Sequence, residues 1–368
     1  MFTFEVVILG GLGGPGENSS QCFMLRPYRS KGIKSICVDG GAGAAQICDT
    51  LMLQQKPVSE RDQLAFHYYE PDDQQYFLEN MIDKQSVAKF GFSSETLDSV
   101  SQERNALKKG YKIYQGIGEY YVTHPHLDHI SAMVVNSPLV YEPPLVSEKT
   151  ICGLDFTVNA LQEHIFNDTI WPNLTYGKLQ KLRVKTLQHS QWAPSSTFPQ
   201  WEIIPFQVCH GCKVAQDSKV YSTVYLIRDK VSRDVIVICG DLEYDYEGEN
   251  HKNLLDNVWR YIAKNVPFKH LKSIFIECSS SSMVACENLY GHLSPPFLIH
   301  ELKSLYKFYG FTNDPFDLHV VIIHVKLTVS DTDPRKTILH ELKELVRGEE
   351  GLNKVRFSIA LDKHRFVL

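Results

Sequence analysis

Residues 123–130 of this chain read THPHLDHI, and this segment constrains the fold more than any other part of the sequence. Three histidines and one aspartate fall within six positions: His124, His126, Asp128 and His129. The chain has only 15 histidines in 368 residues. By chance, an H-x-H-x-D-H pattern would arise in about one such chain in a thousand. A polar turn with solvated histidines therefore explains the cluster poorly, and a metal site explains it well.

The spacing of these residues suits a pair of metal ions. The apolar run at 117–123 predicts a strand. His124 and His126, two positions apart at its end, can point the same way. Asp128 and His129 follow in what we expect to be a loop, from which they can turn toward a second ion. Imidazole nitrogens and carboxylate oxygens bind zinc at about 2.0–2.2 Å, and two ions about 3.5–4 Å apart can share a bridging hydroxide.

Strand-like and helix-like segments alternate along the whole chain, which predicts an α/β fold. Strands are expected at 4–9, 21–27, 35–43, 117–123, 201–211, 219–229, 234–241, 273–280 and 317–326, and helices at 95–109, 155–166, 253–265, 294–310 and 333–351. We expect 219–229 and 234–241 to pair as a hairpin. We interpret 1–368 as one domain, in which the polar stretch at about 55–110 is an insertion or a helical cover.

The composition argues against several classes of protein. No apolar run reaches the roughly 18 residues of a membrane-spanning helix, and the start, MFTFEVVILGGLGG, has no basic segment and reads as a strand rather than a signal peptide. The net charge of −5 disfavours a broad nucleic-acid-binding face. Many of the nine cysteines lie in apolar strand-like runs, as expected for buried, reduced thiols in a cytoplasmic protein. We therefore expect neither a membrane nor a nucleic acid as partner.

A longer stretch around the cluster is more specific. Residues 124–138 read HPHLDHISAMVVNSP. This stretch resembles the signature of the class II 3′,5′-cyclic-nucleotide phosphodiesterases, the low-affinity fungal type, which belong to the metallo-β-lactamase fold superfamily. Ala132 stands where that family usually has glycine. The Gly-rich start of the chain and the VDGGAG segment also resemble the family. The resemblance implies a metallo-β-lactamase αββα sandwich with a two-metal site at one edge.

The resemblance also implies further ligands after later strands. His210 in VCHG is expected to join His124 and His126 at the first metal. Asp241, after the aliphatic run VIVICG, is expected to bridge the two metals. Glu243 and Asp245 are rivals for that role, but neither follows a strand-end glycine.

The last ligand is expected near the C-terminal end of the chain. His324 follows the aliphatic run VVII, and the resemblance implies that it joins Asp128 and His129 at the second metal. His319 begins the same run, and two residues five apart point to opposite faces of a regular strand. We prefer His324, because the site is expected at the strand end.

Other residues are candidates for supporting roles. His292, in Gly-His-Leu-Ser, resembles a His-x-Ser/Thr motif of the phosphodiesterase branch and is the candidate proton donor, although Ser294 could be only a helix cap. Asp39 and Glu277 are candidates to orient metal-binding histidines through hydrogen bonds. The segment 11–16 has the spacing GxGxxG, but the residues after it do not open a helix of the kind that binds dinucleotides. We expect it to be a turn near the site.

The activity implied by the resemblance is hydrolysis of cyclic AMP, with cyclic GMP as a second candidate substrate, to nucleoside 5′-monophosphates. It would use two Zn²⁺ ions, or other divalent ions such as Mn²⁺, and a bridging hydroxide, with His292 and Asp128 as the candidate catalytic residues. Two alternatives are a ribonuclease Z-like endonuclease acting on tRNA 3′ ends and a catalytically silent metal-binding scaffold. Whether residues 55–110 cover the site or make a subunit contact in a homodimer is left open.

Overall fold

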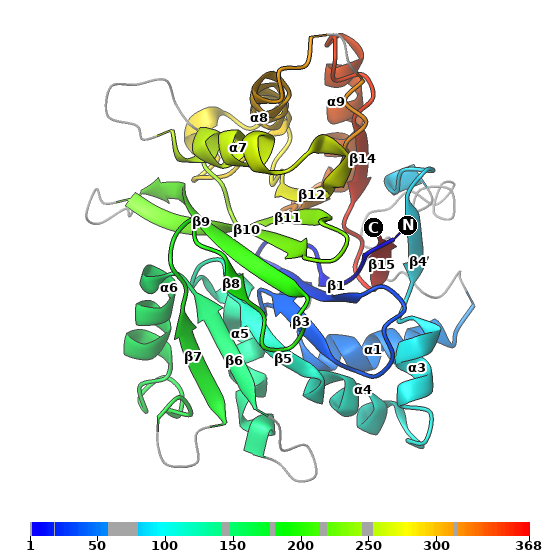
Figure 1. Ribbon diagram of the computed structural model, residues 1–368, viewed down its shortest axis with the longest axis vertical. Helices are drawn as coiled ribbons and strands as arrows, with labels where there is room; N and C mark the ends of the chain where they lie inside the picture. Colours follow the sequence, from blue (N-terminus) through cyan, green and yellow to red (C-terminus); the bar gives the residue numbers. More distant parts are fainter. Residues whose placement is uncertain are drawn as a thin grey trace.

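Two β-sheets lie face to face between two layers of helices (Figure 1). The structure is a computed structural model that describes residues 2–17, 19–57, 80–141, 148–176, 181–212, 219–244, 253–312 and 315–368. The N- and C-terminal ends of the chain lie side by side, and the backbone nitrogen of Phe4 donates to the carbonyl of Leu368 at 2.9 Å. This arrangement is the αββα sandwich that the sequence predicted.

The first sheet has strand order β4-β15-β1-β2-β3-β5-β6-β7. Its strands are β1 (Phe4–Gly10), β2 (Cys22–Pro27), β3 (Ser35–Val38), β4 (Val87–Phe90), β5 (Ile117–Tyr121), β6 (Lys149–Gly153), β7 (Leu182–Thr186) and β15 (His364–Val367). The neighbours β3, β5, β6 and β7 run parallel to one another. The neighbouring strands from β4 through β15, β1 and β2 to β3 pair antiparallel. The parallel half therefore brings the ends of β3 and β5 to one edge of the sheet.

The second sheet has strand order β14-β13-β12-β11-β10-β9-β8. Its strands are β8 (Ala193–Pro194), β9 (Trp201–Cys212), β10 (Lys219–Asp229), β11 (Val235–Cys239), β12 (Leu271–Glu277), β13 (His319–Ile323) and β14 (Arg356–Ile359). The expected hairpin of β10 and β11 is present. The strands from β11 to β14 run parallel, so β11, β12 and β13 also end at one edge.

The helices cover the outer faces of the sheets (Figure 1). They are α1 (Ala44–Gln54), α3 (Ser94–Ser99), α4 (Ala106–Gln115), α5 (Leu127–Asn136), α6 (Asp155–Ala160), α7 (Leu254–Asn265), α8 (Pro295–Phe308) and α9 (Pro334–Arg347), with short 3-10 turns at Ser137–Tyr141, Phe268–His270 and Cys286–Asn288 and a π turn at Leu161–Ile165. The apolar faces of α1, α4 and α5 pack on the first sheet. Those of α7, α8 and α9 pack on the second.

A third apolar core joins the two sheets, because alternate residues of each strand point inward. Phe23 of β2 meets Phe275 of β12 here, with ring centroids 5.8 Å apart. Both rings are fully buried. This dry interface fixes the two sheets against each other, and the residues that follow their strands are held with them.

The polar stretch at 55–110 differs from a simple helical cover. Residues 58–79 lie outside the described part of the chain. The helix expected at 95–109 is two helices, α3 and α4, and Asn105 caps the second by accepting from the backbone nitrogen of Lys108. β4 adds a strand beside β15 at the sheet edge. The division of the chain into one domain with an insertion stays a prediction.

None of the helices in the described ranges combines the length and the apolar character that crossing a bilayer requires. Eight cysteines in the same ranges are free of disulfides, and seven of them are buried, as expected from their strand-like contexts. The side chain of Cys212, in the Cys209-x-x-Cys212 pair, is outside the described residues.

Candidate metal centre and active site

The THPHLDHI segment follows β5 and leads directly into α5. His126 occupies the N-cap position of that helix, with extended backbone angles. The helix begins at Leu127, so Asp128 and His129 belong to its first turn, and the prediction that they lie in a loop was wrong. A carboxylate in a first helical turn is stabilised by the helix dipole. The start of α5 therefore turns Asp128 and His129 away from His124 and His126.

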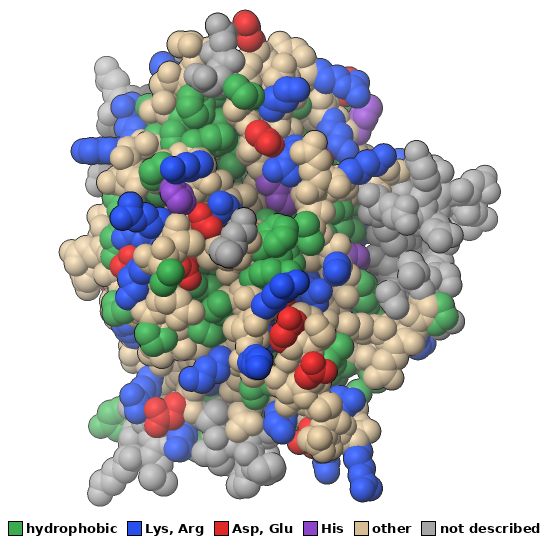
Figure 2. Space-filling model, turned by 45° about the vertical axis from the view of Figure 1, so that its right-hand side comes forward, with side chains coloured by type: hydrophobic (Ala, Val, Ile, Leu, Met, Phe, Trp, Pro, Cys, Tyr) green, Lys and Arg blue, Asp and Glu red, His purple; other side chains and the backbone are tan. Residues whose placement is uncertain are grey.

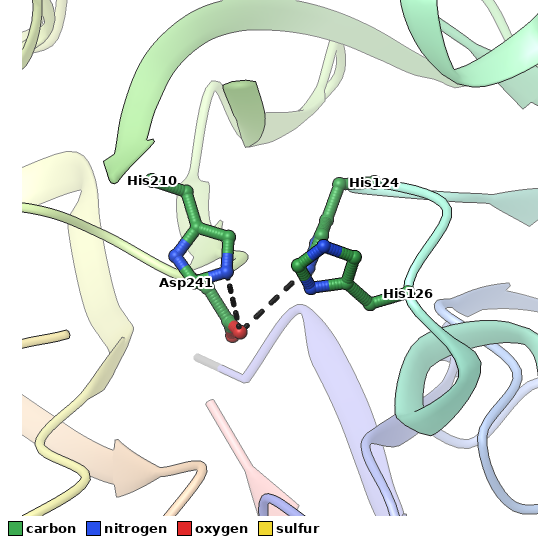
Figure 3. Close-up of side chains that lie close together, drawn as sticks. All are labelled: His124, His126, His210 and Asp241. Atoms are coloured by element: carbon green, nitrogen blue, oxygen red, sulfur yellow. Dashed lines mark ion pairs between the residues drawn. The ribbon is translucent and has the colours of Figure 1, made fainter. Parts of the chain in front are cut away.

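The first set of potential ligands combines His124, His126, His210 and Asp241. One nitrogen or oxygen atom of each lies within 4.8 Å of the others. Figure 3 shows the three imidazoles gathered around the Asp241 carboxylate, with His210 coming from the end of β9. Oδ2 of Asp241 is 3.6 Å from Nε2 of His124 and 3.5 Å from Nε2 of His210. Each of these residues follows or ends a strand at the same edge of the sandwich.

The second set combines Asp128, His129 and His324, again with atoms within 4.8 Å of one another. Nε2 of His324 is 3.2 Å from Oδ2 of Asp128. Oδ1 of Asp241 is 3.3 Å from Nε2 of both His129 and His324. Oδ2 of Asp241 thus faces the first set, and Oδ1 faces the second set.

His129 is held by Asp39, which follows β3. Nδ1 of His129 lies 2.8 Å from Oδ2 of Asp39. The same carboxylate accepts from the backbone nitrogen of Thr123 at 2.7 Å and from Nε2 of Gln21 at 2.9 Å. Asp39 has a left-handed φ of 59°, an uncommon conformation for a non-glycine residue. The predicted orienting role of Asp39 fits this contact, because it leaves Nε2 of His129 facing the centre.

His210 is held by a backbone carbonyl that no sequence pattern singles out. Its Nδ1 lies 2.8 Å from the carbonyl oxygen of Gly291. A carbonyl can only accept, so Nδ1 carries the proton and Nε2 is free to bind a metal. Gly291 and Gly211 both have left-handed φ angles, 80° and 79°, and a Cβ on Gly291 would lie 2.8 Å from the nitrogen of Gly211. The two glycines allow this close approach.

His324 is held by the glycine-rich turn at 11–16, as expected for a turn near the site. The backbone nitrogen of His324 donates to the carbonyl of Gly11 at 2.7 Å. A Cβ on Gly13 would lie 2.6 Å from the His324 ring, so only glycine fits there. Gly14 donates from its backbone nitrogen to Oδ2 of Asp128 at 3.2 Å. The turn therefore contacts two members of the second set.

His292 lies beside both sets, within 4.8 Å of Asp241 and His324 by ligand atoms. Its Nδ1 is 2.9 Å from Oε1 of Glu277, the last residue of β12. Glu277 also accepts from the backbone nitrogen of Leu242 at 2.7 Å. Glu277 was predicted to orient a metal-binding histidine, but the histidine that it contacts directly is His292, the candidate proton donor. Ser294 is the N-cap residue of α8, although its side chain makes no capping hydrogen bond.

The rejected rivals lie elsewhere. His319, at the start of β13, is buried, and its Nε2 lies 3.0 Å from Oγ of Ser86 and 2.9 Å from Oγ of Ser358. Glu243 is half-buried and belongs to none of the candidate metal-binding groups in the described ranges. Asp245 lies outside the described residues.

The electrostatics of the centre are those of buried, mutually dependent groups. Burial lowers the pKa of His210 to about 4, against the attraction of Asp241. Burial by itself would raise the pKa of Asp241, but the surrounding imidazoles, His324 first, hold it well below its usual value. Burial opposes protonation of His292 as well, yet Glu277 outweighs it and raises the pKa of His292.

The donor set fits metal ions. Nε2 of His124 and Oδ1 of Asp241 are buried and make no hydrogen bond within the described part of the chain. Buried polar atoms are rarely left without a partner, so each such atom requires an explanation. Imidazole nitrogens and carboxylate oxygens are the ligands that zinc prefers, and the two sets flank one shared carboxylate. The centre can therefore hold a divalent metal ion at either set.

Fold and centre together define a protein of the metallo-β-lactamase fold. A zinc-bound PqqB from Methylobacterium extorquens shares this fold, with a TM-score of 0.50, 10% identity and coverage of 97% of this chain and 98% of that chain. The family model of the class II cAMP phosphodiesterases matches residues 37–362, so the chain belongs to that family.

A curated sequence and a solved structure match this chain over their full lengths. The 3′,5′-cyclic-nucleotide phosphodiesterase 1 of Saccharomyces cerevisiae is 43% identical over 374 residues, which cover 100% of both chains. The crystal structure of unliganded yeast PDE1 superposes with a TM-score of 0.91 at 41% identity, again over 100% of both chains.

Proposed function

We propose that this chain hydrolyses 3′,5′-cyclic nucleotides to nucleoside 5′-monophosphates at a centre for two Zn²⁺ ions. The observation that carries the proposal is the position of Asp241, whose two oxygens face two separate ligand sets. The membership of the chain in the class II cAMP phosphodiesterase family supports the substrate class. The name of the yeast relative supports the 3′,5′-cyclic nucleotide as substrate and leaves the base open.

The side chains divide between the two ions according to their positions. His124, His126 and His210 would hold one ion, Asp128, His129 and His324 would hold the other, and Asp241 would bridge. When bound, two such ions would activate a water as the hydroxide nucleophile for phosphorus, and they would offset the negative charge that develops on its oxygens. Other divalent ions, such as Mn²⁺, could take these positions.

His292 is suited to donate a proton to the leaving ribose 3′ oxygen. Glu277 accepts a hydrogen bond from Nδ1 of His292 and so fixes the orientation of the ring. Glu277 outweighs the effect of burial and raises the pKa of His292, which favours the protonated form that a general acid requires. Asp128, on the other side of Asp241, has a lowered pKa: burial would raise it, but the hydrogen bond with His324 and the attraction of His129 and His324 outweigh that effect.

The alternatives have less support. On the face drawn in Figure 2, basic side chains are interspersed with acidic and apolar ones, which does not favour a broad surface for gripping tRNA. Membership of a phosphodiesterase family, with both Asp128 and Asp241 in place, disfavours a silent scaffold. We keep the cytoplasm as the proposed compartment and a homodimer as an untested prediction.

The proposal is tested by product analysis with cyclic AMP, cyclic GMP and a precursor tRNA, each with and without a chelator. We expect 5′-AMP from cyclic AMP, no cleavage of the tRNA, and loss of activity after metal removal. Hydrolysis that survives complete removal of metal would refute the mechanism. Cleavage of the tRNA alone would refute the substrate, and no cleavage of any substrate by the metal-loaded protein would favour the scaffold.

A further inference from the structure

Ser279 is a buried hydroxyl between the end of β12 and His324. It is 1% exposed, and its Oγ lies 3.0 Å from Nδ1 of His324. The same Oγ lies 2.7 Å from Oε2 of Glu277 and 2.8 Å from the carbonyl oxygen of His324. Nδ1 of His292 lies further away, at 3.4 Å. Four polar atoms of three residues therefore converge on one serine side chain.

The chemistry of these partners fixes the direction of each hydrogen bond. A hydroxyl has one proton to donate, and both Oε2 of the Glu277 carboxylate and the His324 carbonyl can only accept. Whichever of them receives the proton, Oγ is left to accept from Nδ1 of His324. That nitrogen therefore carries a proton, and in the neutral imidazole, the form that binds a metal, Nε2 keeps its lone pair. Nε2 is the atom that lies 3.2 Å from Asp128 and 3.3 Å from Asp241.

We propose that Ser279 is a positioning residue for the second metal: its hydroxyl holds His324 in the tautomer whose Nε2 can bind the ion. The inference rests on the two-metal function proposed above. It adds a residue that neither the sequence pattern nor the family assignment singles out. Two other imidazoles of the centre have equivalent partners, Asp39 on His129 and the Gly291 carbonyl on His210. Ser279 supplies the corresponding partner for His324.

Ser279 also joins the metal ligand to the candidate proton donor. Glu277 accepts from Ser279 with Oε2 and from His292 with Oε1. One buried carboxylate thus orients His324 through the serine and His292 directly. His324 and the candidate proton donor are consequently oriented by the same residue at the end of β12.

The test is zinc binding by Ser279→Ala, measured by competition with a chromophoric chelator. Loss of a partner that orients a metal ligand typically weakens metal binding by about 10–100-fold. We expect this weakening only for the zinc ion held by Asp128, His129 and His324. The other zinc equivalent should bind as in the unaltered protein. The control is Ser358→Ala, which removes another buried serine that lies 2.9 Å from a histidine, His319, and which should leave both equivalents unchanged.

The unfolding midpoint of the metal-free variant separates positioning from a general structural role. We expect Ser279→Ala to unfold at nearly the same denaturant concentration as the unaltered chain. If Ser279→Ala binds both zinc equivalents as tightly as the unaltered chain does, the inference is overturned. Weakened binding of both equivalents together with a lower unfolding midpoint would also overturn it. An unaltered chain that binds no second zinc would refute the proposed function itself, so the two failures are distinguishable.

Discussion

Among individual residues of the centre, His292 combines a position beside both ligand sets with a direct carboxylate partner. If it acts as a proton donor and not as a ligand, His292→Ala should keep about two zinc ions per chain while kcat falls by roughly 10²–10⁴-fold. Metal analysis and steady-state kinetics on the same preparation check both parts. The exposed His300 of α8 offers a control, since His300→Ala should change neither. Loss of zinc from His292→Ala would make His292 a ligand instead.

His319 allows a prediction about pH. Burial lowers the pKa of His319 to about 4, whereas a histidine in the unfolded chain titrates near 6.5. Between these values the unfolded chain binds a proton that the folded chain does not, so the free energy of unfolding falls as the pH falls from 6.5 to 4. The full effect is about 3 kcal/mol.

His319→Gln should remove that part of the pH dependence. Denaturant unfolding of the metal-free protein at several pH values measures this dependence. The titration of the candidate metal centre is common to both proteins, so it cancels in the difference between their free energies of unfolding. His340→Gln, at an exposed position on α9, serves as the control and should follow the unaltered chain. Parallel curves for His319→Gln and the unaltered chain would contradict the assignment of this pH dependence to His319.

Single residues also show where sequence reasoning reaches its limit. The metal-ligand candidates stood out because histidine is rare and four of them cluster in THPHLDHI, while His210, Asp241 and His324 follow strand-like runs. Thr123, Gly291 and Ser279 are common residue types, and they matter through hydrogen bonds to a histidine or aspartate that is distant in the sequence. Only the three-dimensional arrangement identifies such contacts.

Among the elements, α5 depends on the turn that follows β3. The backbone nitrogen of Gly40 donates to the carbonyl of His129 at 2.7 Å, and a Cβ on Gly41 would lie 1.9 Å from the carbonyl oxygen of Asp128. Gly41→Ala should therefore displace the first turn of the helix, lower the free energy of unfolding by roughly 1–3 kcal/mol and weaken zinc binding.

Thermal unfolding and zinc competition measure these effects of Gly41→Ala. Gly348, at the C-cap of α9, is the matched control, because a Cβ added there would have no neighbouring atom within 4 Å. Gly348→Ala should change stability by less than about 0.5 kcal/mol. A Gly41→Ala protein as stable as the control, with unchanged zinc binding, would show that the helix tolerates the methyl group.

The elements that the sequence predicted are those with strong local signals. β11 is a continuous aliphatic run, and α9 begins with Asp333 and Pro334 and has an apolar face. Leu345 of α9 is 38% exposed, unlike Leu339 and Leu342. The start of α5 was missed because histidine is not a favoured N-cap residue. The short edge strand β8 has only two residues and depends on its pairing with β9.

In the molecule as a whole, the chain returns to its starting sheet after completing the second one. β14 ends the second sheet, and β15 then inserts between β1 and β4 of the first. No local pattern predicts this crossing, because it depends on which strand edges are left open.

Deletion of residues 364–368 should therefore abolish stable folding, since it leaves one edge of β1 unpaired and separates β4 from the sheet. The expected cost is comparable with the whole stability of a typical domain, roughly 5–15 kcal/mol. Circular dichroism during heating checks it. A cooperative transition within a few degrees of that of the full chain would contradict the view that β15 is an integral strand.

The central claim is that two metal ions, one on each side of Asp241, act together on a cyclic phosphodiester. The most direct test is to remove all metal and restore zinc stepwise while 5′-AMP production from cyclic AMP is followed. We expect activity to rise to its maximum at two zinc equivalents per chain and to be lost in Asp241→Asn. Full activity at one equivalent, or without metal, would contradict the claim.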